Sequence, residues 1–246
     1  AHIGQPKESQ DKAFKLLHAG ISGVRKSRPL IDQTLPMNQN ALVLGGGVTG
    51  MTAALQLANQ DIKVYLVERG PVLGGLAMSI QKTIEGDDVG PFMDKLVEIV
   101  LAHKNIQVLT KSIIVDHSGI PGRFKTGIQT GIRMNYMQLS HGVTILATGA
   151  LPNRPDSYGL GTHINITTQL ELDAMIEDAP EKIKTMNHVV MIQCVGSREP
   201  GNPNCSRICC QTSIKNALRI KAINPDAQIF ILYRDIRTYG FYEDYY

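Results

Sequence analysis

The stretch Ala41-Leu42-Val43-Leu44-Gly45-Gly46-Gly47-Val48-Thr49-Gly50 decides the expected fold. Its four leading apolar residues fit a short buried parallel strand, and Gly45, Gly47 and Gly50 form the G-x-G-x-x-G pattern at which such a strand turns into a helix. The first glycine permits the tight turn, the second lets the backbone approach a pyrophosphate, and the third lets the helix pack closely on the strand. Helix formers and a second apolar stretch follow, and that stretch ends in Glu68, which would accept hydrogen bonds from a ribose. The pattern predicts a βαβ unit that binds a dinucleotide.

Hydropathy and turn residues predict how the chain continues on either side of this unit. The expected elements are a helix over 7–24, a helix over 92–103, a strand over 106–109, an antiparallel meander over 112–137, a strand over 142–149, a helix over 168–177, a strand over 188–193, a helix over 213–222 and a strand over 228–233. A proline-containing loop over 150–158 is the expected internal boundary. We therefore expect an α/β protein with an N-terminal helix and linker over 1–40, a Rossmann-like domain with an antiparallel β insertion over 41–150, and part of a second Rossmann-like unit over 151–246.

Composition excludes several classes of protein. The 246 residues are 43% hydrophobic and 19% charged with a net charge of +3, which predicts a globular chain and not a disordered one. No apolar run approaches the roughly 18–20 residues needed to cross a bilayer, so we expect no membrane span. Only 5% of residues are aromatic and no basic patch is present, so we expect no nucleic-acid partner. The chain begins at Ala1 and ends at Tyr246 without secretion or terminating signals, which indicates a piece of a longer polypeptide.

The residues after the second expected strand favour FAD over NAD. The stretch Glu68-Arg69-x-x-x-Leu73-Gly74-Gly75 resembles the extension that thioredoxin-reductase-like flavoproteins, which have two dinucleotide-binding domains, place after this strand. The stretch Ile145-Leu146-Ala147-Thr148-Gly149-Ala150 resembles the second flavin signature of the same class. The domain over 41–150 is therefore expected to bind FAD. The expected FAD-binding residues are Gly45, Gly47, Gly50, Glu68, Arg69, Gly74, Gly75, Thr148 and Gly149.

All four cysteines of the chain lie within seventeen residues: Cys194, Cys205, Cys209 and Cys210. They occupy the turn at which such flavoproteins usually carry a second glycine fingerprint for NAD(P)H, so we expect no NAD(P)H site in this chain. Four soft thiolate ligands in the pattern Cys-x10-Cys-x3-Cys-Cys suit an iron–sulfur cluster. Three alternatives stay open. The first is zinc, although adjacent cysteines fit poorly around one tetrahedral ion. The second is a redox disulfide, although the sequence has no C-x-x-C motif. The third is that the thiols are buried and inert.

Three stretches carry a resemblance to a known family. Cys194-Val195-Gly196-Ser197-Arg198, Cys205-Ser206-Arg207-x-Cys209-Cys210 and Tyr233-Arg234-Asp235-Ile236-Arg237-Thr238-Tyr239-Gly240 resemble the A subunit of heterodisulfide reductase and its relatives, including quinone-interacting oxidoreductase subunits of sulfate reducers. The resemblance covers most of 41–246. It implies an FAD-containing electron-transfer subunit, often bifurcating, whose four cysteines bind a [4Fe–4S] cluster near the flavin. The family's ferredoxin-like domains, and the extra cysteines that many members carry in the 75–91 region, are absent from this sequence.

We therefore expect an oxidoreductase that passes electrons between FAD and the cluster. Clustered thiols need a reducing compartment, which points to an anaerobic cytoplasmic complex. The resemblance implies B-like and C-like subunits as partners, an electron-donating subunit such as a hydrogenase, formate dehydrogenase or similar protein, and ferredoxin as a further partner. Lys215 is the expected catalytic residue, because it would place a positive charge beside a reduced flavin; a solvated helix lysine is the alternative. Other interpretations stay open: a pyridine-nucleotide disulfide oxidoreductase, a glutamate-synthase-like flavoprotein, or a scaffold subunit with a structural metal.

Overall fold

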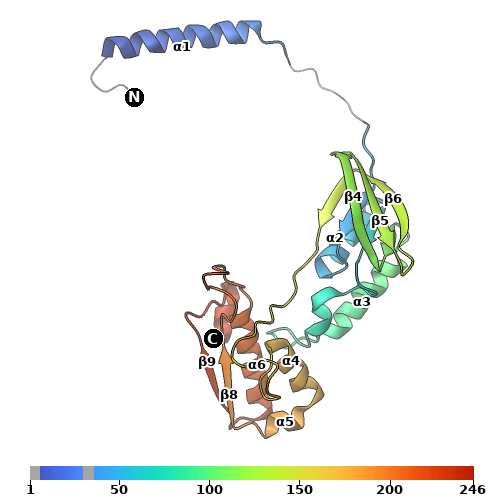
Figure 1. Ribbon diagram of the computed structural model, residues 1–246, viewed down its shortest axis with the longest axis vertical. Helices are drawn as coiled ribbons and strands as arrows, with labels where there is room; N and C mark the ends of the chain where they lie inside the picture. The colour runs from blue at the N-terminus through green and yellow to red at the C-terminus, as the bar shows by residue number, and fades with distance from the viewer. Residues whose placement is uncertain (1–5, 30–35) are drawn as a thin grey trace. The chain divides into compact units, whose positions relative to one another are not determined.

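The computed structural model describes residues 6–29 and 36–246, which belong to two compact units, Ala1–Pro36 and Met37–Tyr246 (Figure 1). In the first unit, the helix expected over 7–24 spans Pro6–Lys26 (α1), and none of its residues is buried. The linker expected over 25–40 falls partly on residues 30–35, which lie outside the described residues, as does the start at Ala1. The domain boundaries expected at residues 40 and 150 stay predictions.

A four-stranded parallel sheet forms the N-terminal part of the second unit. Its strand order is β3-β2-β1-β7, made of Ile106–Leu109 (β3), Val64–Val67 (β2), Ala41–Leu44 (β1) and Val143–Leu146 (β7). The helices Val48–Ala58 (α2) and Val89–Ala102 (α3) pack on one face, where Ala41 and Val43 contact a core that includes Met51 and Met93. The predicted βαβ unit and its crossover are therefore present, and α3 begins three residues before the expected start.

An antiparallel sheet covers the other face of the parallel sheet. It has the order β4-β5-β6 and contains Ser112–Ile120 (β4), Arg123–Thr130 (β5) and Asn135–His141 (β6). Leu42 and Val67 point to this side, because side chains alternate along a strand, and they pack with Ile128 and Leu139 of the antiparallel sheet. The predicted meander is thus an insertion between β3 and β7, and it runs four residues further than expected.

His141 is a buried histidine within this insertion. Its Nδ1 lies 3.0 Å from Val143 O, and because a carbonyl oxygen only accepts, Nδ1 carries the donated proton. Burial lowers the pKa of His141, so the ring is neutral and Nε2 accepts the hydrogen bond from Thr126 Oγ1 at 2.8 Å. Thr126 Oγ1 in turn lies 2.7 Å from Nδ1 of His117. The arrangement leaves one consistent tautomer for His141.

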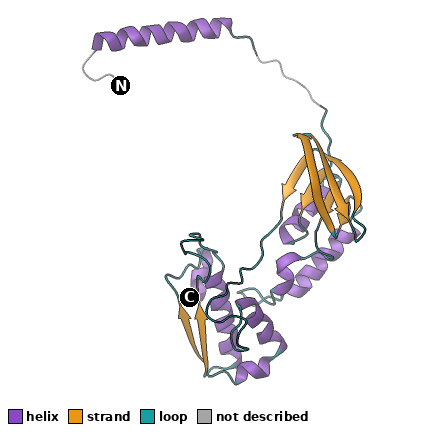
Figure 2. Ribbon diagram, viewed as in Figure 1, coloured by secondary structure: helices purple, strands orange, loops and turns teal. Residues whose placement is uncertain are grey.

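We call residues 37–146 the first lobe and residues 169–246 the second lobe. The second lobe contains the helices Gln169–Asp178 (α4), Pro180–Lys184 (α5) and Cys209–Ile223 (α6), the parallel strands His188–Ile192 (β8) and Gln228–Leu232 (β9), and a 3-10 helix, Gly240–Tyr245 (η2). Figure 2 shows its strand pair apart from the strands of the first lobe. Helix α6 begins four residues earlier than expected, so it includes Cys209 and Cys210.

One face of the β8–β9 pair is buried and the other is exposed. Leu172, Ile176 and Ile220 pack with Met191 on the helix side. The opposite face exposes apolar side chains of alternate residues: Val190, Ile192, Phe230 and Leu232. Helices cover both faces of most parallel sheets. In the β8–β9 pair they cover only one face, as expected for part of a Rossmann-like unit.

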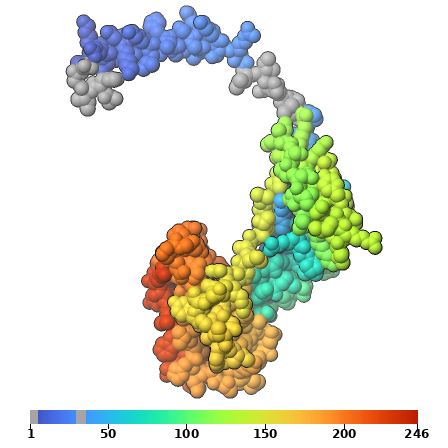
Figure 3. Space-filling model, in the orientation of Figure 1, coloured from blue at the N-terminus to red at the C-terminus, as the bar shows by residue number. Residues whose placement is uncertain are grey.

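The segment 147–168 connects the lobes without a helix or strand, and its later part, yellow in Figure 3, lies on the surface of the second lobe. Asn153 Nδ2 donates to Gly196 O at 3.4 Å, and Arg154 pairs with Glu171. Thr168 caps α4 reciprocally with Glu171, which fixes where the helix begins. Within the described parts of the chain, no helix combines the length and apolarity that crossing a membrane requires.

Candidate functional site

The glycine turn after β1 has the geometry of a phosphate-binding turn. Gly45 has φ +106°, and a Cβ on it would lie 2.1 Å from Ala147 O. A Cβ on Gly50 would lie 1.8 Å from Gly45 O, so this glycine lets α2 approach the turn. Gly47 differs, because a Cβ there would meet no atom within 4 Å. The middle glycine therefore borders open space at the N-terminus of α2, where backbone N–H groups attract an anion.

Glu68 and the loop after β2 lie beside this turn. Glu68 Oε2 accepts from Gly46 N and Oε1 accepts from Gly70 N, both at 2.6 Å. These two bonds fix the carboxylate while leaving lone pairs on both oxygens for a ribose. Arg69 is exposed. The carboxylate expected to bind a ribose is thus held against the glycine turn.

Gly74 and Gly75 continue the loop along the glycine turn. Gly74 N donates to Gly46 O at 2.8 Å, and a Cβ on Gly75 would lie 3.2 Å from the Cα of Gly47. Both glycines have positive φ, +121° and +58°. Their lack of side chains is what allows the two stretches of backbone to approach each other.

The end of β7 reaches the same edge of the sheet. Ala147 N donates to Leu44 O at 2.8 Å, and the backbone of Ala147 and Thr148 borders Gly45. Thr148 and Gly149 are exposed next to this contact. The structure therefore gathers the glycine turn, Glu68, Gly74–Gly75 and the end of β7 at the carboxyl edge of the parallel sheet, where α/β proteins bind ligands.

The four cysteines are free thiols on the loop after β8 and the start of α6. Cys194 and Cys210 are buried and Cys209 is half-buried. Burial raises the pKa of the Cys210 thiol, and proximity to Cys209 and Cys194 raises it further. Cys205 Sγ instead accepts from Arg207 N at 3.4 Å. Across residues 6–29 and 36–246, no group of three or more histidine, cysteine, aspartate or glutamate side chains is arranged to hold a metal ion.

A clamp of charged residues holds the cysteine loop. Arg198 forms an ion pair with Asp235, and Asp235 forms a second ion pair with Arg237 at 3.0 Å. Hydrogen bonds from Arg237, the larger effect, and from Arg198 lower the pKa of Asp235. The backbone of the loop is left-handed at Cys194, Arg198 and Arg207, a conformation that costs non-glycine residues free energy. Asp235 and Arg237 belong to the third stretch that carries the family resemblance. That stretch thus has a physical role here, because it fastens the loop that carries Cys194 and Cys205.

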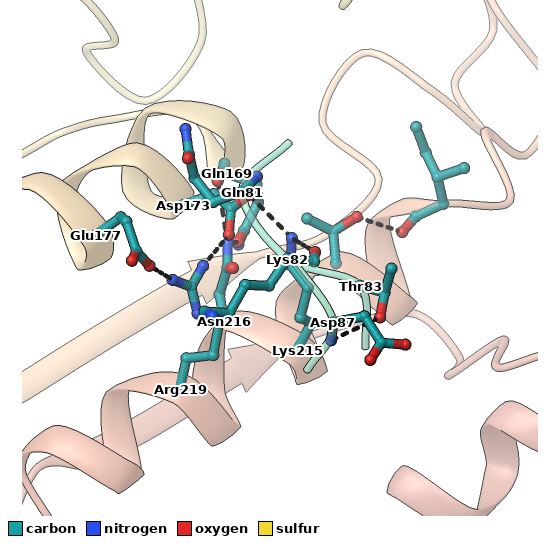
Figure 4. A network of polar contacts seen from close by, with 12 residues as sticks. Gln81, Lys82, Thr83, Asp87, Gln169, Asp173, Glu177, Lys215, Asn216 and Arg219 are labelled. Carbon is teal, nitrogen blue, oxygen red and sulfur yellow. Dashed lines mark hydrogen bonds and ion pairs between the residues drawn. The ribbon is translucent and has the colours of Figure 1, made fainter. Parts of the chain in front are cut away.

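Lys215 does not extend into solvent. Its Nζ lies 3.0 Å from Asp173 Oδ2 and donates to Lys82 O at 3.0 Å (Figure 4). Asp173 was not predicted as its partner, although the sequence holds a signal: Asp173 with Glu177, and Lys215 with Arg219, are like-charged pairs one helical turn apart. Like charges at this spacing destabilise a helix, and ion pairs between the acidic pair and the basic pair would offset that repulsion. The expected position of Lys215 beside a flavin stays a prediction.

The residues present fit a dinucleotide, and their donor atoms suit a cluster. Gly47 leaves open space that a Cβ would occupy. A pyrophosphate-binding turn needs this space so that the ligand can approach the backbone. Four thiols on one loop and one helix start are the donors that iron and sulfide prefer, but binding one cluster requires their side chains to come closer together.

Comparison with known proteins agrees with these features. Residues 43–96 match the family described as NAD(P)-binding Rossmann-like domain. The chain is 28% identical to an iron-sulfur A subunit of CoB–CoM heterodisulfide reductase from Methanopyrus kandleri and 26% identical to the corresponding protein of Methanocaldococcus jannaschii. Each match covers 100% of this chain and 51% of the relative, so the chain spans about half the length of the curated relatives it matches.

Solved structures with a partly similar arrangement include a thioredoxin reductase and a dehydrogenase. Thioredoxin reductase of Lactococcus lactis has a TM-score of 0.49 and 16% identity, covering 84% of this chain and 60% of that one. L-proline dehydrogenase of P. horikoshii has a TM-score of 0.49 and 16% identity, covering 87% of this chain and 39% of that one. The predicted resemblance is confirmed by the curated relatives: over its whole length this chain is similar to the A subunits of heterodisulfide reductases.

Proposed function

We propose that the glycine turn binds FAD and that this chain is the flavin-binding, electron-transferring part of a heterodisulfide reductase-type A subunit. The observation that carries the proposal is the open space at Gly47, which adjoins the backbone of Gly75 at the edge that also holds Glu68. A loop with two adjacent glycines against the turn favours FAD over NAD, as in the flavoprotein extension that it resembles.

The chain's own residues have separate tasks in binding. The first N–H groups of α2 donate to the pyrophosphate, Glu68 accepts from the ribose hydroxyls, and the end of β7 at Thr148–Gly149 leaves room for the cofactor. FAD, when bound, supplies two-electron exchange with one partner and one-electron exchange with another. The protein therefore contributes position and electrostatic environment, and no side chain needs to react covalently.

The same proposal assigns Cys194, Cys205, Cys209 and Cys210 to a [4Fe–4S] cluster. Cys194 and Cys209 lie close enough to Cys210 to raise its pKa, and Cys205 lies on the loop between them. A raised pKa disfavours the Cys210 thiolate, and a metal would relieve this, because a cationic centre favours the deprotonated ligand. These four cysteines would hold the cluster, which would supply one-electron chemistry when bound.

Similarity to the relatives supports a proposal for the role of the whole protein. A flavin and one cluster store few electrons, so we propose an exit through other parts of the polypeptide or through B-like and C-like subunits. A hydrogenase, formate dehydrogenase or similar protein would donate electrons, ferredoxin would be a further partner, and the complex would work in an anaerobic cytoplasm. Electron bifurcation at the flavin is part of this proposal.

Cofactor analysis of the full-length protein, purified anaerobically from its native source, tests the proposal. We expect stoichiometric FAD together with iron and acid-labile sulfide in equal amounts, and co-purifying iron–sulfur or disulfide-reducing subunits. Protein without FAD would refute the flavin assignment, and zinc without iron would refute the cluster. A native protein that ran as a lone species would refute the assignment to a complex.

A further inference from the structure

The second lobe contains a buried cluster of charges around Asp173 to which the binding of FAD and of an iron–sulfur cluster, as proposed above, assigns no contact. Asp173 of α4 is fully buried and pairs with Lys215, at 3.0 Å, and with Arg219, both on α6. Arg219 also pairs with Glu177 at 2.6 Å. Figure 4 shows these side chains meeting between the two helices. Buried charges are tolerated when they are paired and hydrogen-bonded, so each member depends on the others.

The same cluster binds backbone of the first lobe. Gln81 N donates to Asp173 Oδ2 at 2.9 Å, and Lys215 Nζ donates to Lys82 O at 3.0 Å. Gln81 and Lys82 follow the short helix Gly75–Ser79 (η1), whose first residue lies against Gly47. Asp173 and Lys215 therefore hold the loop that lies against the glycine turn.

Helix α6 links this fastening to the cysteines. The helix begins with Cys209 and Cys210 and carries Lys215 less than two turns further on. The covalent connection between the lobes, 147–168, has no helix or strand that would fix their relation. Hydrogen bonds to Asp173 and Lys215 are thus placed to set how the cysteine helix lies relative to the glycine-turn lobe.

We propose that Asp173 is a positioning residue that holds α6, and with it Cys209 and Cys210, in register with the loop 75–82 of the FAD-binding lobe. The Asp173 carboxylate accepts a hydrogen bond from Gln81 N and neutralises Lys215, whose Nζ donates to Lys82 O. Both contacts with the loop therefore depend on Asp173. The inference rests on the proposed function for the identity of the two redox groups, whereas the contacts between the lobes do not depend on it.

The test compares variants of the full-length, cofactor-containing protein by hydrogen–deuterium exchange. Asp173→Asn removes the charge, and the double variant Asp173→Asn with Lys215→Met also removes the cation that would be left unpaired. Asp173→Glu keeps the charge and the acceptor. Glu181→Gln is the matched control, because it removes an exposed pair with Lys184 in the same lobe. Bound FAD, iron content and the visible circular dichroism of the bound flavin are measured on each.

We expect both charge-removing variants to keep FAD and iron, while exchange in the peptide 75–88 rises by about tenfold or more, the factor that a hydrogen bond to a charged group contributes. The visible circular dichroism should change with it, and Asp173→Glu should restore both signals towards wild type. The Glu181→Gln control should match wild type throughout.

Wild-type exchange in 75–88 and an unchanged flavin signal in a folded double variant would overturn the inference. Failure of both charge-removing variants to fold would overturn it as well, because Asp173 would then be needed for folding and not for alignment. A wild-type protein that contains no FAD or no iron would refute the proposed function instead, and the exchange measurement would still decide whether Asp173 positions the loop.

Discussion

Replacing Gly47 by valine should weaken FAD binding without unfolding the protein. Gly47 has φ −77° and ψ −178°, a backbone conformation open to any residue, and a Cβ there meets no protein atom within 4 Å. The steric cost to the folded chain is therefore close to zero. A change of about 1 kcal/mol or less in the free energy of unfolding is expected, because valine is a poorer N-cap than glycine but restricts the unfolded chain.

The same substitution at Gly50 is the matched comparison. A Cβ on Gly50 would lie 1.8 Å from Gly45 O, an atom of the backbone, so the helix or the turn must move. Overpacking of this kind costs about 1–3 kcal/mol or more. Gly50→Val should therefore lose stability, whereas Gly47→Val should keep its stability and lose only affinity for FAD.

The affinity loss at Gly47 follows from the same overpacking energy, now placed between the side chain and the pyrophosphate. About 1–3 kcal/mol corresponds to a roughly 5- to 150-fold weaker Kd for FAD. The assay is FAD titration of the deflavinated protein beside thermal unfolding of both variants. A Gly47→Val protein that folds and binds FAD with wild-type affinity would show that the pyrophosphate lies elsewhere.

Four further predictions can be checked independently. Cys205→Ser should remove about four iron atoms per chain, because one lost ligand opens a four-cysteine site; retention of all iron would exclude Cys205. NADH and NADPH should not reduce the flavin of this chain rapidly, and stopped-flow reduction within the dead time would contradict this. The free energy of unfolding should fall as pH decreases from about 7.5 to about 5, and fall less in His141→Gln: the folded pKa lies below the unfolded value of about 6.5, so the unfolded chain binds more protons. The flavin's midpoint potential should rise in Asp173→Asn and fall in Lys215→Met, which redox titration measures.

Much of the fold could be predicted because local patterns and tertiary structure agree. The run Ala41–Leu44 is apolar throughout since both faces of β1 are buried, one against α2 and α3 and the other against the antiparallel sheet. Helix boundaries were less accurate. Helix α6 begins at Cys209, so its first turn includes the cysteine pair. The apolar periodicity that predicts this helix starts only at Ser213 and does not reveal that turn.

The glycine turn was also predictable, because each of its glycines is needed for a local backbone contact or for open space. Gly45 and Gly50 permit close backbone contacts and Gly47 leaves space, as the G-x-G-x-x-G spacing requires. The clamp on the cysteine loop was not predictable, since Arg198 and Asp235 are 37 residues apart and only the fold brings them together. Contacts over such distances carry no periodic signal.

The charge balance around Asp173 decides what Lys215 can contribute to a nearby flavin. The formal charges of Asp173 and Glu177, two negative, balance those of Lys215 and Arg219, two positive, so the ion-paired cluster has no formal net charge. A lysine whose ammonium lies 3.0 Å from a buried carboxylate offers little net field to a reduced flavin. The sequence suggested a free cation, whereas the structure gives a compensated one.

Removing one partner at a time makes this field measurable. Asp173→Asn leaves the cluster with one excess positive charge, which favours the reduced, more negative flavin and raises its midpoint potential. Lys215→Met leaves one excess negative charge and lowers the potential, and the double variant is again neutral and should return close to wild type. A general loosening of the fold would shift both single variants in the same direction. Opposite shifts that cancel in the double variant therefore identify Lys215 as electrostatically coupled to the flavin, and three unchanged potentials would refute its predicted catalytic role.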